Sequence, residues 1–299
     1  MQLNLPTPIE PIEFEGLSLY LKRDDLIDVH FSGNKARKLY YYLVNDFPDI
    51  EKIVSYGSSQ SNAMYSLSVL AKIRGWEFEY YVDHIADYLK KNPHGNYKAA
   101  LDNGMNIIAG EEITPAQTFE DNTLFIQEGG RQKEAEYGIE ILAQEIIDWQ
   151  IKNGIRDLNI FLPSGTGTTA LFLQKSMIKM QSQTVSSKVY TCACVGGDEY
   201  LQKQFAMLEE DERLHPTILN IGKKHHFGKL YEENYKIWLK LQEQTGVEFD
   251  LLYDPMGWQT LIDHKDLFDK PILYIHQGGV FGNESMLLRY QRRYPDITK

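Results

Sequence analysis

Residues 32–39 read Ser-Gly-Asn-Lys-Ala-Arg-Lys-Leu, and the rest of the chain is best interpreted from this stretch. An alternating apolar run at 17–21 precedes it and predicts a strand, and apolar residues at helical spacing continue to Leu43. Lys35 is therefore expected in the first turn of a helix, where the partial positive charge of the helix N-terminus disfavours a cation. This field and partial burial would lower the pKa of the amine and keep part of it neutral, as Schiff-base chemistry requires. On spacing alone, a solvated lysine in a charged segment is the simpler explanation.

The composition is that of an ordinary globular protein. The 299 residues are enough for one large domain or two of common size, and 42% are hydrophobic. The net charge of −11 without a basic cluster argues against nucleic acid as a partner. We expect no signal peptide and no membrane segment, because the chain has no basic leader and no long apolar run. Cys192 and Cys194 would share one face of a strand as buried thiols, which fits a reducing cytoplasm.

Strand patterns alternate with helix patterns along the whole chain, which predicts an α/β protein with mainly parallel sheets. The further strands are expected at 52–56, 76–82, 105–109, 123–126, 159–162, 189–195, 249–253 and 271–275. The clearest further helices are expected from Met64 to Ala71 and at 134–152, 170–177, 201–205, 231–244 and 284–292. A polar loop is expected around 93–96.

A loop of small residues between a predicted strand and a predicted helix could hold an anion. It consists of Gly165, Thr166, Gly167, Thr168 and Thr169. Glycines let the backbone approach a phosphate, threonine hydroxyls donate hydrogen bonds, and the helix N-terminus adds partial positive charge. The loop also matches Gly-x-Gly-x-x-Ala, but the acidic partner of a dinucleotide site should lie about 20 residues on, and Asp198 is too distant. A phosphate site, a dinucleotide site and a plain turn therefore all stay open on this loop alone.

Gln60, Ser61 and Asn62 open a predicted helix directly after a strand. Ser and Asn are good helix caps, so capping alone explains them. The same short polar side chains and exposed backbone N–H groups also suit a carboxylate.

Together these motifs resemble the pyridoxal 5'-phosphate (PLP) enzymes of the tryptophan synthase β fold type. The match is strongest to the branch of D-cysteine desulfhydrase and 1-aminocyclopropane-1-carboxylate (ACC) deaminase, on residues 22–26 and 33–39. The resemblance implies a two-domain α/β fold, with a large PLP-binding domain at 1–39 and 149–299 and a small inserted domain at 40–148. Catalysis is then expected between the domains, at the carboxyl ends of strands.

The resemblance also assigns roles. Lys35 would carry PLP covalently and act in catalysis, with Asn34 and Asn62 beside the cofactor and its phosphate on residues 165–169. Gln60, Ser61 and Asn62 would bind the substrate carboxylate, with Ser61 also counted as catalytic.

Toward the C-terminus the sequence departs from the family pattern. Residues 254–260 align with a family segment reading Asp-Pro-Val-Tyr and then Thr or Glu, which puts Gly257 at the tyrosine and Trp258 at the next position. Trp258 is then expected to line and narrow the substrate pocket. Gln277 stands where the desulfhydrases have a threonine near the pyridine nitrogen, and a neutral amide weakens the electron sink there.

These features predict a PLP-dependent lyase or deaminase that acts on a small amino acid. We expect β-elimination from a substrate such as D-cysteine, giving pyruvate and ammonia. ACC deamination, PLP or amino-acid binding without turnover, and a nicotinamide-dependent oxidoreductase are the alternatives. No metal site is expected. A cytoplasmic homodimer that binds neither nucleic acid nor membrane completes the prediction.

Overall fold

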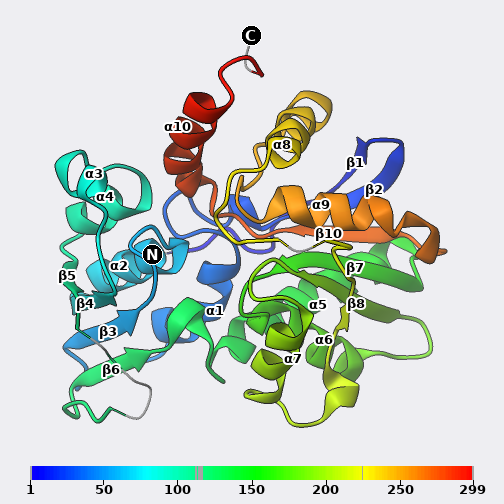
Figure 1. The fold of residues 1–299 in the computed structure, drawn as a ribbon. Helices are drawn as coiled ribbons and strands as arrows, with labels where there is room; N and C mark the ends of the chain where they lie inside the picture. The colour runs from blue at the N-terminus through cyan, green and yellow to red at the C-terminus, as the bar shows by residue number, and fades with distance from the viewer. Residues whose placement is uncertain (1, 112, 114–116, 224, 298–299) are drawn as a thin grey trace.

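The chain folds around two separate β-sheets (Figure 1). The computed structural model describes residues 2–111, 113, 117–223 and 225–297. The α/β class with parallel-rich sheets, predicted from the alternating pattern, is confirmed. No helix in these ranges is long and apolar enough to cross a membrane.

The larger sheet has six strands in the order β1-β2-β10-β7-β8-β9. All neighbours are parallel except β1 and β2, which form an antiparallel pair. The central position of β10 explains its wholly buried side chains, because it lies between β2 and β7. The strands are β1 Ile9–Phe14, β2 Leu17–Arg23, β7 Asp157–Ser164, β8 Ser186–Ala193, β9 Thr217–Ile218 and β10 Ile272–His276.

The smaller sheet is entirely parallel and has the order β5-β4-β3-β6. Its strands are β3 Lys52–Tyr56, β4 Glu77–Val82, β5 Asn106–Ala109 and β6 Thr123–Ile126. The predicted domain boundaries fall inside the helices α1 and α5, so the division at 39/40 and 148/149 stays a prediction. The strands of the smaller sheet all come from the predicted inserted segment.

Helices connect the strands and cover both sheets (Figure 1). They are α1 Gly33–Val44, α2 Asn62–Arg74, α3 Asp87–Lys91, α4 Gly95–Asp102, α5 Ala135–Asn153, α6 Thr168–Met180, α7 Asp198–Ala206, α8 Glu232–Thr245, α9 Asp254–Asp263 and α10 Asn283–Arg293. Short 3-10 turns are η1 Asp24–Leu26, η2 Glu128–Gly130, η3 Glu212–Leu214, η4 Lys265–Leu267 and η5 Val280–Gly282.

Two sequence expectations about secondary structure are wrong. Residues 249–253 form a turn, not a strand, because Asp250 accepts hydrogen bonds from the N–H groups of Leu252 (2.9 Å) and Tyr253 (2.6 Å). The turn leads into α9, most of whose residues are buried in the core. The sequence pattern did not predict this helix. The expected loop at 93–96 also contains the start of α4.

The thiols of Cys192 and Cys194 are free and buried, as predicted. Their sulfur atoms are 3.9 Å apart. No cluster of potential metal ligands occurs within the described ranges.

Candidate active site

Lys35 lies in the first turn of α1, as predicted from the spacing. The helix starts at Gly33, whose φ of +61° is unfavourable for other residues. A Cβ at Gly33 would lie 1.7 Å from the backbone oxygen of Gln277, so only glycine allows this contact. The N–H of Asn34 donates to the same oxygen at 2.9 Å. The glycine therefore brings the start of α1 against the loop that follows β10.

The Lys35 amine is adapted to lose its proton easily. The side chain is half-buried, and Nζ donates to Oδ1 of Asn34 at 3.0 Å. Burial lowers the pKa of Lys35 to about 8, while the Asp250 carboxylate acts in the opposite direction. A substantial neutral fraction near this pH suits a nucleophile or a base.

Lys38 is in a different situation from Lys35, although it is on the same helix. It is buried, and its Nζ donates to the backbone oxygen of Gly129. Burial, with a smaller effect of the Lys35 charge, lowers the pKa of Lys38 well below its usual value. Its hydrogen bond ties α1 to the turn η2 of the inserted segment, which gives Lys38 a structural role.

Residues 165–169 form the turn from β7 into α6, with Thr168 and Thr169 buried. Gly167 is the N-cap residue and provides no side-chain cap, so the first N–H groups of a 13-residue helix have no capping side chain. The hydroxyls of Thr166 and Thr168 lie 3.2 Å apart at this end. Uncapped N–H groups and paired hydroxyls fit an anion such as a phosphate.

Gly167 itself serves the packing of α6 on α7. Its φ is +72°, and a Cβ there would lie 2.5 Å from Leu201 and 2.4 Å from Phe205. Gly165 is different, because the atoms nearest to its Cβ would belong to Tyr253, the closest at 3.4 Å, which is an ordinary contact. Gly165 is therefore the glycine of this loop that can be changed without a clash.

Gln277 links three segments at the carboxyl edge of the larger sheet. Its Oε1 accepts a hydrogen bond from Nδ2 of Asn34 (2.9 Å), and its Nε2 donates to the backbone oxygen of Pro163 (2.6 Å). The amide thus holds the start of α1 beside the end of β7. Asn34 is positioned by the same bond.

The segment of Gln60, Ser61 and Asn62 caps α2. The Ser61 hydroxyl accepts from the N–H of Ala63 at 3.1 Å, so the capping interpretation is confirmed. The Gln60 side chain instead donates to the Tyr88 hydroxyl at 3.3 Å. Asn62 faces the loop after β10, since a Cβ on Gly279 would lie 2.9 Å from its Nδ2.

Trp258 does not belong to this site, and the prediction that it contacts a substrate is wrong. Its side chain is 0% exposed and packs in the core of the larger sheet. The indole stacks on Tyr274 at 4.3 Å and meets Phe14 and Phe249 edge-on. A ring surrounded on these faces by aromatic side chains has no surface left for a ligand.

The tyrosine near the site is Tyr253, four residues before the predicted position of Gly257. Its ring lies against Gly165, at the loop between β7 and α6. Residues 250–254 read Asp-Leu-Leu-Tyr-Asp, which fits the family spacing of an aspartate, two residues, a tyrosine and then an acid. We therefore align the family segment on Asp250, four residues before the position expected from Asp254 and Pro255. The following acid, Asp254, is buried and accepts from Tyr274 (2.6 Å) and from the N–H of Asp250 (3.0 Å).

Sequence reasoning missed Asp250. Its carboxylate has Lys35 as its charged neighbour, and its Oδ2 lies 3.7 Å from the Cβ position of Gly279. The signal was present in the Asp-x-x-Tyr spacing, but the apolar residues around it were interpreted as a strand.

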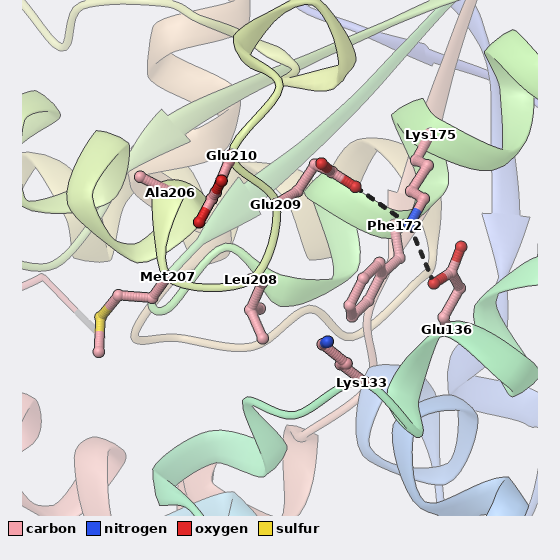
Figure 2. Close-up of a pocket in the computed structure, with 9 residues that line it drawn as sticks. All are labelled: Lys133, Glu136, Phe172, Lys175, Ala206, Met207, Leu208, Glu209 and Glu210. Atoms are coloured by element: carbon pink, nitrogen blue, oxygen red, sulfur yellow. Dashed lines mark hydrogen bonds and ion pairs between the residues drawn. The ribbon is translucent and has the colours of Figure 1, made fainter.

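A separate surface pocket of about 400 Å³ lies between the start of α5, the middle of α6 and the segment at the end of α7 (Figure 2). The Lys175 ammonium forms ion pairs there with Glu136 (3.2 Å) and Glu209 (3.1 Å). None of the predicted site residues lines it.

No protein-family model matches the chain. It is 25% identical to a D-cysteine desulfhydrase of Serratia proteamaculans, over 91% of each protein. It is 22% identical to a putative ACC deaminase of Thermotoga maritima, over 93% of this chain and 95% of the relative. The solved structure of an ACC deaminase homologue superposes with a TM-score of 0.74 at 21% identity, covering 95% of this chain and 93% of that one.

The fold is that of the PLP enzymes of the tryptophan synthase β type. The predicted resemblance to D-cysteine desulfhydrase and ACC deaminase is confirmed as well. The assignment of the cofactor lysine to the first turn of α1, and of the cofactor phosphate to the loop before α6, stays a prediction from the sequence.

Proposed function

We propose that this protein is a PLP-dependent lyase or deaminase that removes the β-substituent of a small amino acid, with D-cysteine as the leading substrate. Loss of the substituent and hydrolysis of the product would give pyruvate and ammonia, with sulfide from cysteine. We also propose that the protein is a cytoplasmic homodimer, and that residues 40–148 form a small domain inserted into the large one.

The observation that carries the proposal is the environment of Lys35. Its pKa is lowered to about 8 by burial, and it is held in place at the start of α1 by Asn34 and the loop after β10. Lys38, the other lysine of this segment, is occupied by the Gly129 oxygen. Lys35 is thus the amine of this segment that can react.

The residues present fit the cofactor. The uncapped start of α6, with the Thr166 and Thr168 hydroxyls, would hold the phosphate. Asn62 and Gln277 would lie beside the ring, and Lys35 would bind the aldehyde carbon. PLP, when bound, supplies an electron sink for the charge left after a proton is removed from Cα.

Side chains of the protein would bind the substrate carboxylate and accept the Cα proton. The Ser61 hydroxyl, whose oxygen accepts from the Ala63 N–H, can donate a hydrogen bond to the substrate carboxylate, with Gln60 and Asn62 beside it. The neutral amine of Lys35 can then accept the Cα proton, because its pKa allows both protonation states near neutrality. A thiolate leaves without further help, so D-cysteine makes the smallest demand on the site.

The test is a product assay with the cofactor-loaded protein and D-cysteine, L-cysteine or ACC as separate substrates. Sulfide and pyruvate from D-cysteine would support the proposal. An oxidation product formed with a nicotinamide cofactor would contradict it. A characteristic PLP spectrum without product from any amino acid would favour binding without turnover.

ACC deamination is the second candidate, and the position of Tyr253 favours it. The alignment on Asp254 put Gly257 at the tyrosine position of the ACC deaminase pattern. With the alignment on Asp250 the tyrosine is Tyr253, which lies against Gly165. The acid that follows, Asp254, is buried with both carboxylate oxygens hydrogen-bonded, so it is not free to act on a ring. Formation of 2-oxobutanoate from ACC would decide for this candidate.

A further inference from the structure

Among the residues that the structure describes, hydrogen bonds reach only one of the two carboxylate oxygens of Asp250. Oδ1 accepts from the N–H groups of Leu252 (2.9 Å) and Tyr253 (2.6 Å). Oδ2 lies 3.7 Å from the Cβ position of Gly279, and Nδ2 of Asn62 lies 2.9 Å from the same point. Asp250 and Asn62 therefore both lie beside Gly279, and Oδ2 accepts no hydrogen bond within the described part of the chain.

The Gly279 loop connects Asp250 to the start of α1. A Cβ on the preceding residue, Gly278, would lie 3.0 Å from the Cα of Gly33 and 2.9 Å from Oγ of Ser32. The loop is thus packed against the residues that precede Lys35. Asp250, from the turn before α9, and the start of α1, which carries Lys35, therefore both contact the loop at 278–279, and the two charged groups interact electrostatically.

The two groups are close enough to interact but are not paired. No ion pair within 4.0 Å joins them in the part of the chain described. Burial raises the pKa of Asp250 to about 6, against the effects of the two N–H donors and of Lys35. The other ionisable groups that interact with it are Tyr253 and Asp254, and burial raises the pKa of each.

We propose that Asp250 is the general acid of the site, which gives its proton to the departing β-substituent and so extends the substrates to amino acids with poor leaving groups, such as a β-hydroxyl. This inference rests on the proposed function. Lys35 takes the Cα proton, the Cβ–O bond breaks with its electron pair on oxygen, and the Asp250 proton makes that oxygen water. The remaining enamine is hydrolysed by water to pyruvate and ammonia. Proton transfer from the Lys35 ammonium to the Asp250 carboxylate restores both groups.

The assignment makes a different demand on different leaving groups. Chloride and thiolate leave without a proton, whereas hydroxide is too basic to leave unprotonated. General acid catalysis contributes typically 10²–10⁴-fold, so its loss should affect only the hydroxyl substrate. Comparing leaving groups in one variant therefore separates an acid from a residue that merely supports the fold.

The decisive variant is Asp250→Asn, tested as the full-length cofactor-loaded protein. The amide oxygen can still accept from the N–H groups of Leu252 and Tyr253, but the side chain cannot transfer a proton. We expect elimination from serine to fall about 100-fold or more, while elimination from β-chloroalanine changes less than about threefold. Both enantiomers are assayed. Asp263→Asn, an exposed carboxylate at the end of α9, is the matched control and should change neither rate.

A second measurement does not depend on turnover. Infrared titration of the wild-type protein should show a carboxylic acid band that is absent from Asp250→Asn and disappears with a midpoint near pH 6. Equal losses with serine and β-chloroalanine, or no such band, would overturn the acid role and leave the proposed function intact. A wild-type protein that releases chloride but not water from these substrates would overturn the extension to β-hydroxy amino acids. A wild-type protein that eliminates from neither would contradict the proposed function itself.

Discussion

Arg37, two residues after Lys35 on α1, forms a bidentate ion pair with Asp24. Nε of Arg37 donates to Oδ2 at 3.0 Å and Nη2 to Oδ1 at 2.8 Å, and both side chains are buried. The guanidinium also reaches both oxygens of Glu145 on α5 at 2.8 Å. Lys22 joins the same group through Glu145 at 2.6 Å. This network fixes the rotation of α1 and hence the direction in which Lys35 points.

Removing the centre of this network should be costly. Arg37→Met leaves the buried carboxylate of Asp24 and the partly buried carboxylate of Glu145 with too little positive charge around them. Breaking one partner of a buried pair typically costs about 3–5 kcal/mol, and denaturant unfolding measures that change in the free energy of unfolding. Lys179→Met is the control, because its ion pair with Glu140 is exposed and screened by solvent, so its loss should change the free energy of unfolding far less. Equal losses in the two variants would contradict the role given to the buried network.

Lys35 is predicted to be the attachment point of the cofactor. Borohydride reduction of the loaded protein followed by peptide mapping should place the pyridoxyl mass on Lys35. Lys35→Ala should lose the covalent adduct because no other amine of this segment is free. Lys38→Met should keep the adduct, since the Lys38 amine donates to Gly129. An adduct on Lys38, or none at all, would be incompatible with the assignment.

The lowered pKa of Lys35 also predicts how stability depends on pH in the cofactor-free protein. Between about 8 and the ordinary value of 10.5, the unfolded state holds the Lys35 proton and the folded state does not. The unfolded state therefore binds more protons, and the contribution of Lys35 to the free energy of unfolding rises with pH in this window. Below it both states are protonated, and the burial of the charge is a constant cost.

Lys35→Met tests this sign. The variant should be more stable than the wild type near neutral pH, and the difference should shrink as the pH rises through the window. Denaturation midpoints at several pH values measure it. A difference that is constant with pH would mean that the Lys35 pKa is not lowered.

The two glycines before α6 should respond differently to alanine. Gly165→Ala adds a Cβ at an ordinary 3.4 Å from Tyr253, so the fold should persist. PLP affinity is expected to fall, because a methyl group on this loop would hinder the close approach of a phosphate to the backbone. Gly167→Ala combines a φ of +72° with contacts of 2.4–2.5 Å to Phe205 and Leu201, so it should lower the melting temperature. PLP affinity by fluorescence and thermal unfolding distinguish the two effects. Unchanged PLP affinity in Gly165→Ala would argue against a phosphate there.

What could be predicted from the sequence depended on how local the interactions are. The first turn of α1 and the Ser61 cap follow from neighbouring residues, and the apolar runs predicted every strand of the two sheets except β1 and β9. Trp258 and Asp250 were not predictable in this way. Their positions depend on aromatic packing across the larger sheet and on a turn whose residues are as apolar as a strand. The family segment was aligned on Asp254 because Pro255 follows it. The spacing between Asp250 and Tyr253 fits the same segment without a gap.

Tyr80 carries a buried hydroxyl that the fold does not use. Its side chain is 1% exposed, and its hydroxyl has no hydrogen-bond partner that meets ordinary geometry in the described residues. The hydroxyl lies so close to Gly57 that a Cβ at this position would be 2.6 Å from the Tyr80 oxygen, so only glycine fits there. A buried polar group without a partner costs about 1–3 kcal/mol, so removing it should not destabilise the protein.

We therefore expect Tyr80→Phe to match or exceed the wild type in free energy of unfolding. Tyr274→Phe is the matched control, because its hydroxyl donates to Asp254 at 2.6 Å and is equally buried. Its removal leaves the Asp254 oxygen unsatisfied, and a loss of about 1–3 kcal/mol is expected. Denaturant unfolding of both variants under the same conditions provides the comparison. A clear loss in Tyr80→Phe would mean that the hydroxyl has a partner in solution, with Ser61 at the start of α2 as the first residue to examine.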